Sequence, residues 1–132
     1  MRQPLVAGNW KMNGSRASVA ALLDGLKAGI NRVTTAEVAV CAPAILIADT
    51  QASLSGSAIK WGGQDISVHE SGAYTGEIAG PMLADFGCHF VIIGHSERRA
   101  YHGESDTLVA EKFVAARKAG VTPILCVGET LE

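Results

Sequence analysis

The sequence lacks a strong charge of either sign, long apolar runs and any signal-like segment. Its 132 residues include 11 lysines and arginines against 13 aspartates and glutamates, a formal net charge of −2, which argues against the basic surface that nucleic-acid binding requires. No apolar run approaches the roughly 20 residues of a membrane-spanning helix, and the N-terminus shows no signal-peptide pattern. The hydrophobic content of 48% argues against a disordered chain. We therefore expect a folded cytoplasmic protein that binds neither nucleic acid nor a membrane.

Cysteine is scarce as well. Cys41, Cys88 and Cys126 are odd in number, far apart, and each lies in or beside an apolar run. They are therefore interpreted as small core residues of a reducing compartment rather than as a disulfide framework. The histidines and cysteines show no metal-ligand spacing, so we expect no metal.

Short β-rich runs alternate with helical patterns along the chain. Strands are expected at 4–10, 37–43, 58–64, 89–95 and 122–129. Such alternation is typical of an α/β fold with a parallel sheet and right-handed crossovers. The run at 89–95 has little polar alternation, as expected of a strand covered on both faces. No low-complexity linker interrupts residues 1–132, so the sequence predicts one domain.

The intervening segments have helical spacing and recognisable ends. Helices are expected over about 15–29, 45–54, 81–86 and 105–120. Ser15 is a suitable N-cap and Gly29 a suitable breaker for the first helix. Its apolar stripe comprises Val19, Leu22, Leu23, Leu26 and Ile30. The last helix has Lys118 in its final turn and stops at Gly120, which fits the helix dipole and C-cap preferences.

The segment 65–78, DISVHESGAYTGEI, is longer than the usual connection of roughly 2–6 residues between a strand and a helix. One interpretation is a solvated surface loop. The other is that it contacts a ligand or a second subunit.

Candidate functional residues follow the ends of two predicted strands. In parallel α/β sheets, ligands bind beyond the carboxyl ends of the strands. Asn9 and Lys11 follow the first strand and His95 ends the fourth, which suits an anionic substrate that has a carbonyl group. Each residue also has a structural interpretation: a solvated lysine, a capping histidine, or, for Glu97, an ordinary charged helical turn. Spacing alone therefore indicates only an α/β protein, interpreted as an enzyme, with a ligand site at this edge of the sheet.

Four motifs narrow the choice. The chain contains AGNWKMN at 7–13, GAYTGEI at 72–78, VIIGHSERR at 91–99 and PILCVGE at 123–129. In this order and spacing they closely resemble the triosephosphate isomerase family. The resemblance implies a (β/α)₈ TIM barrel, of which this chain would form the first four βα units and the fifth strand. It also implies interconversion of dihydroxyacetone phosphate and D-glyceraldehyde 3-phosphate in glycolysis and gluconeogenesis, without a cofactor.

The resemblance assigns roles to individual residues. His95 would be the catalytic electrophile that polarises the carbonyl and moves protons between its oxygens. Lys11 would bind the substrate anion, Asn9 would support the substrate site, and Glu97 would position Lys11.

The resemblance also assigns the 65–78 loop. In this family the loop inserts beside the active site of a second subunit. Thr75, with Tyr74 and Gly76, would therefore lie at a homodimer interface.

One part of the family pattern has no counterpart here. No residue matches the glutamate base on the sixth strand, the lid that follows it, or the glycine-rich phosphate loops. We therefore expect the chain alone to be inactive, with unpaired edges on the strands at 4–10 and 122–129 that favour aggregation or self-pairing. The alternatives are a non-catalytic half-barrel assembly module and a doubly wound anion-binding domain.

Overall fold

A five-stranded parallel sheet forms the centre of the computed structural model, which describes residues 2–128. The strands are β1 (Leu5–Asn9), β2 (Glu37–Cys41), β3 (Ile59–Gly63), β4 (Phe90–Ile93) and β5 (Thr122–Leu125). Their order in the sheet is β1-β2-β3-β4-β5, and every neighbouring pair is parallel. All five predicted strands are confirmed, each somewhat shorter than expected.

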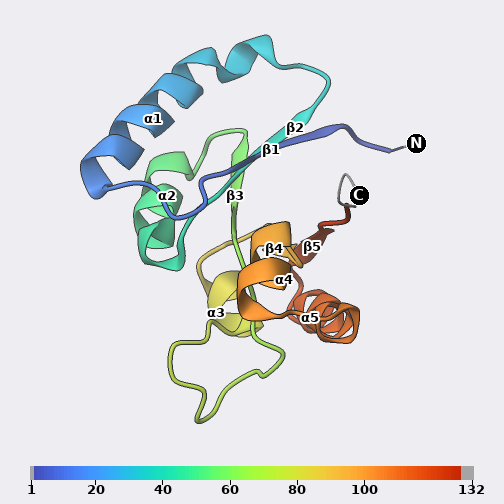
Figure 1. Ribbon diagram of the computed structural model, residues 1–132. Coiled ribbons are helices and arrows are strands. Elements are labelled where there is room, and N and C mark those ends of the chain that lie inside the picture. Colours follow the sequence, from blue (N-terminus) through green and yellow to red (C-terminus); the bar gives the residue numbers. More distant parts are fainter. Residues whose placement is uncertain (1, 129–132) are drawn as a thin grey trace.

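Five α-helices connect these strands. They are α1 (Arg16–Gly29), α2 (Ile47–Leu54), α3 (Gly80–Asp85), α4 (Ser96–His102) and α5 (Asp106–Lys118), with short 3₁₀ turns at Ile30–Arg32 and Ala44–Leu46. In Figure 1, α1, α2, α3 and α5 follow one another around the outside of the strands. Each new strand pairs beside its predecessor in the curled sheet, so there is no point at which the strand order reverses. That order contradicts the doubly wound alternative, in which strand order reverses.

The core lies between the helices and one face of the sheet. Val91 and Ile93 of β4 are fully buried there, in the same apolar cluster as Leu23 of α1 and Val109 of α5. Every residue of β4 is buried, which confirms the prediction that this strand is covered on both faces. Burial of side chains of this size stabilises the fold by roughly 1.5–3 kcal/mol each.

The first helix begins as predicted but ends differently. Ser15 Oγ accepts a hydrogen bond from the backbone N–H of Ser18, and Ser18 Oγ accepts one from the backbone N–H of Ser15, a reciprocal capping box. Gly29 has right-handed helical geometry and the chain continues into a 3₁₀ turn, so Gly29 is the last helical residue and not a left-handed cap. The buried apolar stripe of α1 is also narrower than predicted, because Leu22 is 47% exposed. It lies about 100° around the helix from Leu23 and so points away from the sheet.

The two outer strands each have one neighbour among the described strands. Val6 of β1 is 62% exposed and Leu125 of β5 is 47% exposed. Aggregation or self-pairing through these edges stays a prediction. Within residues 2–128, no helix is both long enough and apolar enough to span a membrane.

Candidate active site

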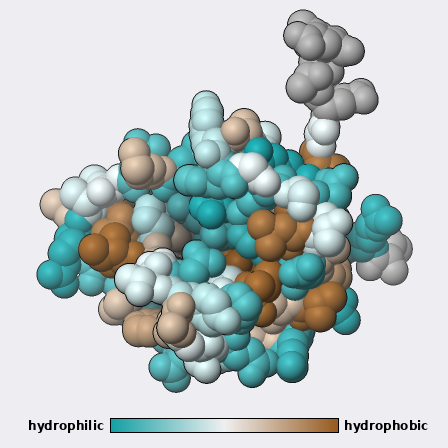
Figure 2. All heavy atoms as spheres, turned by 60° about the horizontal axis from the view of Figure 1, so that its bottom comes forward, coloured by the Kyte–Doolittle hydropathy of each residue, from teal (hydrophilic) through white to brown (hydrophobic). Residues whose placement is uncertain are grey.

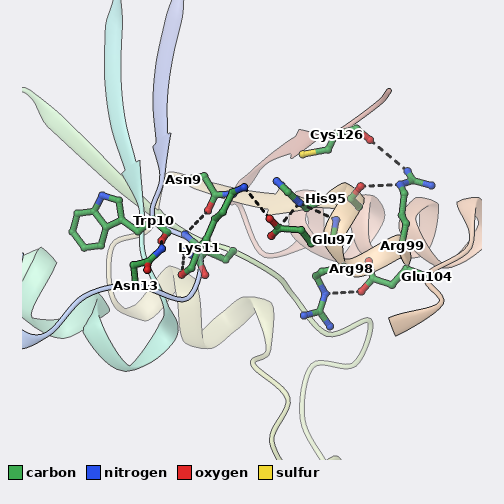
Figure 3. Close-up of polar contacts among 12 residues, drawn as sticks. Asn9, Trp10, Lys11, Asn13, His95, Glu97, Arg98, Arg99, Glu104 and Cys126 are labelled. Carbon is green, nitrogen blue, oxygen red and sulfur yellow. Dashed lines mark hydrogen bonds and ion pairs between the residues drawn. The ribbon is translucent and has the colours of Figure 1, made fainter. Parts of the chain in front are cut away.

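The predicted site residues of β1 and β4 come together at the carboxyl ends of the strands (Figure 3). Asn9 is the last residue of β1, and Lys11 follows two positions later. His95 lies immediately before α4, and Glu97 lies in the first turn of that helix. All four line one open pocket with a volume of about 680 Å³. The four residues therefore lie at one edge of the sheet, as the positions of the strand ends led us to expect, and their chemical roles stay predictions.

Lys11 sits in a tight turn that its neighbours hold in place. Its φ of 55° is the only positive value among the non-glycine residues described, and this left-handed region is unfavourable for a lysine. Asn9 Oδ1 accepts a hydrogen bond from the Lys11 N–H at 2.9 Å, and Gln64 Nε2 donates to the Lys11 carbonyl at 3.0 Å. This role of Gln64 was not predicted from the sequence. Its position at the end of β3, on the same edge of the sheet, was the available signal.

Glu97 and Lys11 form the ion pair that the family resemblance implied. Lys11 Nζ lies 2.8 Å from Glu97 Oε1, and both side chains remain partly exposed. The hydrogen bond from Lys11 lowers the pKa of Glu97, and the same bond raises the pKa of Lys11. Both groups are therefore charged at neutral pH, and the ion pair orients the ammonium among the residues that line the pocket.

His95 is the N-cap of α4. Its Nδ1 accepts a hydrogen bond from the backbone N–H of Glu97 at 3.1 Å. The same Nδ1 lies 3.5 Å from Glu97 Oε2, which would be an ion pair only with a protonated ring. The shorter backbone bond requires a lone pair on Nδ1 and so indicates the neutral ring with its proton on Nε2. Within the described residues Nε2 has no protein partner, so it is available to a substrate oxygen.

The 65–78 loop projects from the body of the protein, at the bottom of Figure 1. Its base is closed by a 2.8 Å hydrogen bond from the Ser67 N–H to the Ile78 carbonyl. Within the loop the rings of His69 and Tyr74 stack with centroids 3.7 Å apart. Thr75 and Tyr74 are not among the residues that line the pocket, whereas Gly76 is. Their contact with a second subunit stays a prediction.

A buried charge cluster, not predicted from the sequence, joins this loop to α4 and α5. It consists of Asp65, Arg98, Glu104 and Lys112. Lys112 Nζ lies 2.7 Å from Asp65 Oδ1 and 2.5 Å from Glu104 Oε2. Arg98 contacts the same two carboxylates at 3.1 and 2.7 Å. The side chains of Lys112 and Glu104 are 6% and 2% exposed. The signal available was a lysine between Val109 and Ala116 on the apolar stripe of α5.

The pocket offers donors for an anion and a carbonyl, and no metal site. Within residues 2–128, no group of three or more His, Cys, Asp or Glu side chains could hold a metal ion. Lys11 can contact an anionic group, and His95 Nε2 can donate to a carbonyl oxygen. Such fixed donors favour developing negative charge on that oxygen.

Comparison with known proteins agrees with this arrangement. Residues 4–132 match the family model described as triosephosphate isomerase. A triosephosphate isomerase of Nitrosococcus oceani is 60% identical over 132 residues, which are 100% of this chain and 53% of that protein. One from Dechloromonas aromatica is 56% identical over 131 residues, 99% of this chain and 52% of that protein. The chain thus spans about half the length of the curated relatives it matches.

A solved structure supports the fold as well. The crystal structure of triosephosphate isomerase from Bartonella henselae superposes with a TM-score of 0.92 at 43% identity. The match covers 98% of this chain and 54% of that one. The curled sheet is therefore the N-terminal portion of a TIM barrel.

Proposed function

We propose that this chain, which belongs to the triosephosphate isomerase family, supplies the electrophile and the anion-binding half of an isomerase site. The reaction would interconvert dihydroxyacetone phosphate and D-glyceraldehyde 3-phosphate in glycolysis and gluconeogenesis. One observation carries the proposal: the Lys11–Glu97 pair lies in the same pocket as a histidine whose Nε2 is free to meet a substrate.

In this site His95 acts on the substrate oxygens. Its Nε2–H donates to the carbonyl oxygen and stabilises the enediolate that forms when a proton leaves the adjacent carbon. The ring then moves protons between the two oxygens, which follows the mechanism of the family. Lys11 binds the substrate anion, Asn9 supports the Lys11 turn, and Glu97 fixes the direction of the ammonium.

The base that removes the carbon-bound proton is not assigned to a described residue. Of the carboxylates that line the pocket, Glu97 is held in its ion pair with Lys11 and Asp65 in the buried charge cluster. The third, Glu77, has no counterpart in the base that the family resemblance describes. We propose that the base comes from outside residues 2–128, as the family resemblance implies. The chain alone would then bind an anion weakly and would not turn substrate over.

We also propose that the functional protein is a cytoplasmic homodimer that uses the 65–78 loop and no cofactor. Thr75, Tyr74 and Gly76 are exposed in this loop. Beside it, a groove of about 200 Å³ is lined by apolar residues of α2 and α3 together with Ile78. Figure 2 shows the face around the loop, with hydrophobic residues in separate groups between hydrophilic ones. Such a mixed surface suits an interface with a second copy.

The test supplies a C-terminal half from a relative. The chain is mixed with a separately produced C-terminal half of the Nitrosococcus oceani protein, and isomerase turnover is measured with a coupled assay. We expect no turnover from the chain alone and measurable turnover from the complex. His95→Gln should reduce it on the order of 10²–10⁴-fold, since a positioned proton donor contributes about that much.

His89→Gln is the matched control. His89 is an exposed histidine at the opposite end of β4, and its replacement should leave turnover unchanged. Turnover by the chain alone would place the base within it. A complex that forms by sedimentation but shows no turnover would contradict the proposed function.

A further inference from the structure

Arg99 of α4 reaches back to the carboxyl ends of two strands (Figure 3). Its Nε donates to the carbonyl of Gly94 at 2.8 Å, and its Nη2 donates to the carbonyl of Cys126 at 3.4 Å. Gly94 follows β4 directly and Cys126 follows β5 directly. One guanidinium therefore bridges the two strand ends from behind the pocket. Arg99 also forms an ion pair with Asp106, whose side chain is 97% exposed.

Gly94 has a conformation and surroundings that leave little room for movement. Its φ of 64° lies in the left-handed region, where a residue with a β-carbon is strained. An added Cβ would come within 2.7 Å of Val109 Cγ1 and 2.9 Å of Arg99 Nη2. Gly94, which leads into His95, is thus packed against Val109 of α5 and bonded through its carbonyl to Arg99.

The next peptide in the chain belongs to His95. The His95 carbonyl accepts hydrogen bonds from the backbone N–H groups of Arg98 and Arg99 at 2.9 and 3.1 Å. Arg99 therefore contacts the backbone on both sides of His95, through its side chain at Gly94 and through its N–H at His95. A shift of the Gly94 carbonyl would rotate the His95 backbone and would lengthen the bond from the Glu97 N–H to Nδ1.

From these contacts we infer that Arg99 is a positioning residue that sets the orientation and tautomer of His95. The inference rests on the proposed role of His95 and extends it to a residue that does not line the pocket. A guanidinium suits this task because its planar set of donors can satisfy two carbonyls in fixed directions, whereas a lysine ammonium is a point charge on a flexible stem. The same bridge fixes β5 relative to β4 at the edge where the substrate would sit.

The test reads the His95 ring directly in this chain, without turnover. Proton–nitrogen correlation spectra distinguish a ring protonated on Nε2 from one protonated on Nδ1, and the His95 signals are identified by their loss in His95→Gln. The unsubstituted chain should show a lone pair on Nδ1. In Arg99→Met the Nε2–H population should fall and the Nδ1–H form should appear, while the amide spectrum stays dispersed.

Two further variants separate positioning from general stability. Asp106→Asn removes only the exposed partner of Arg99 and should leave the His95 signals unchanged. Arg99→Lys keeps the charge but cannot bridge both carbonyls, so it should give a smaller shift in the same direction. If Arg99→Met does not fold, the His95 spectrum of Arg99→Lys is compared with that of the unsubstituted chain instead.

The inference is wrong if a folded Arg99→Met, or Arg99→Lys in its place, keeps the His95 spectrum of the unsubstituted chain. It is also wrong if Asp106→Asn reproduces the change. Where the reconstituted complex turns substrate over, Arg99→Met should lower kcat on the order of 10²-fold, as small misplacements of a catalytic group do, with little change in KM. An inactive complex with the expected spectra would contradict the proposed reaction but would leave the positioning of His95 by Arg99 intact.

Discussion

Replacing Lys112 with methionine should destabilise the chain by about 3 kcal/mol, because Asp65 and Glu104 would lose a buried counter-charge. Removing one partner of a buried ion pair typically costs about 3–5 kcal/mol. The lower end applies here, since Arg98 still contacts Glu104 at 2.7 Å and Asp65 at 3.1 Å. For a chain of this length, such a loss lowers the melting temperature by on the order of 10 °C.

The double variant Lys112→Met with Glu104→Met separates the ion pair from its surroundings. An apolar pair of similar volume is often as stable as the ion pair it replaces. Arg98 and Asp65 would remain as an ion pair with no net charge. We therefore expect the double variant to lie within about 1 kcal/mol of the unsubstituted chain. The resulting coupling energy, measured by urea unfolding of the four proteins, should be at least about 2 kcal/mol.

Lowering the pH should destabilise the fold through the same charge cluster. Burial would raise the pKa of Glu104, but the hydrogen bonds from Lys112 and Arg98 outweigh it and hold this pKa below the ordinary value of 4.5. A lowered folded-state pKa stabilises the fold above the unfolded-state pKa, and this stability is lost as the pH falls through the folded-state value. The free energy of unfolding should therefore decrease below about pH 4.5, less steeply in Lys112→Met. A loss below about 1 kcal/mol in Lys112→Met, or strictly additive effects in the double variant, would refute the reasoning.

Two further outcomes are expected. Ser15→Ala should lower the free energy of unfolding by about 1 kcal/mol in urea titrations, because the capping box of α1 would lose its acceptor; an unchanged midpoint and slope would contradict this role. Burial raises the pKa of the Cys41 thiol to about 12 and that of Cys88 to about 11. At pH 8 both should therefore react with a maleimide far more slowly than the less buried Cys126, and mass spectrometry can follow the labelling. Similar rates for all three thiols in the folded chain would contradict the protection of Cys41 and Cys88 by burial.

The elements could be predicted because their signals are local. Ser15 caps the first helix through contacts within four residues, and the apolar run of β4 reports its own burial. The strand ends also indicated the site, because a parallel sheet places all its carboxyl ends on one edge. Asn9, Lys11 and His95 were found by this rule alone.

The supporting contacts could not be predicted, since they depend on residues far apart in the sequence. Lys112 meets Asp65 across 47 positions, and Arg99 meets Cys126 across 27. A lysine on an apolar stripe and two arginines in a charged turn do not reveal their partners. The left-handed backbone of Lys11 was hidden for the same reason, since the amide of Gln64 that braces it lies 53 positions away.

The left-handed backbone of Lys11 makes stability and function favour different residues at this position. A non-glycine residue in the left-handed region carries strain of about 1–3 kcal/mol, and a glycine in place of Lys11 would relieve it. The same change would remove the only cation bonded to Glu97 among the described residues. Selection for thermal stability alone would thus favour replacement of Lys11. Directed evolution that is scored on folding, without an activity screen, would therefore yield a more stable protein whose site has lost this cation.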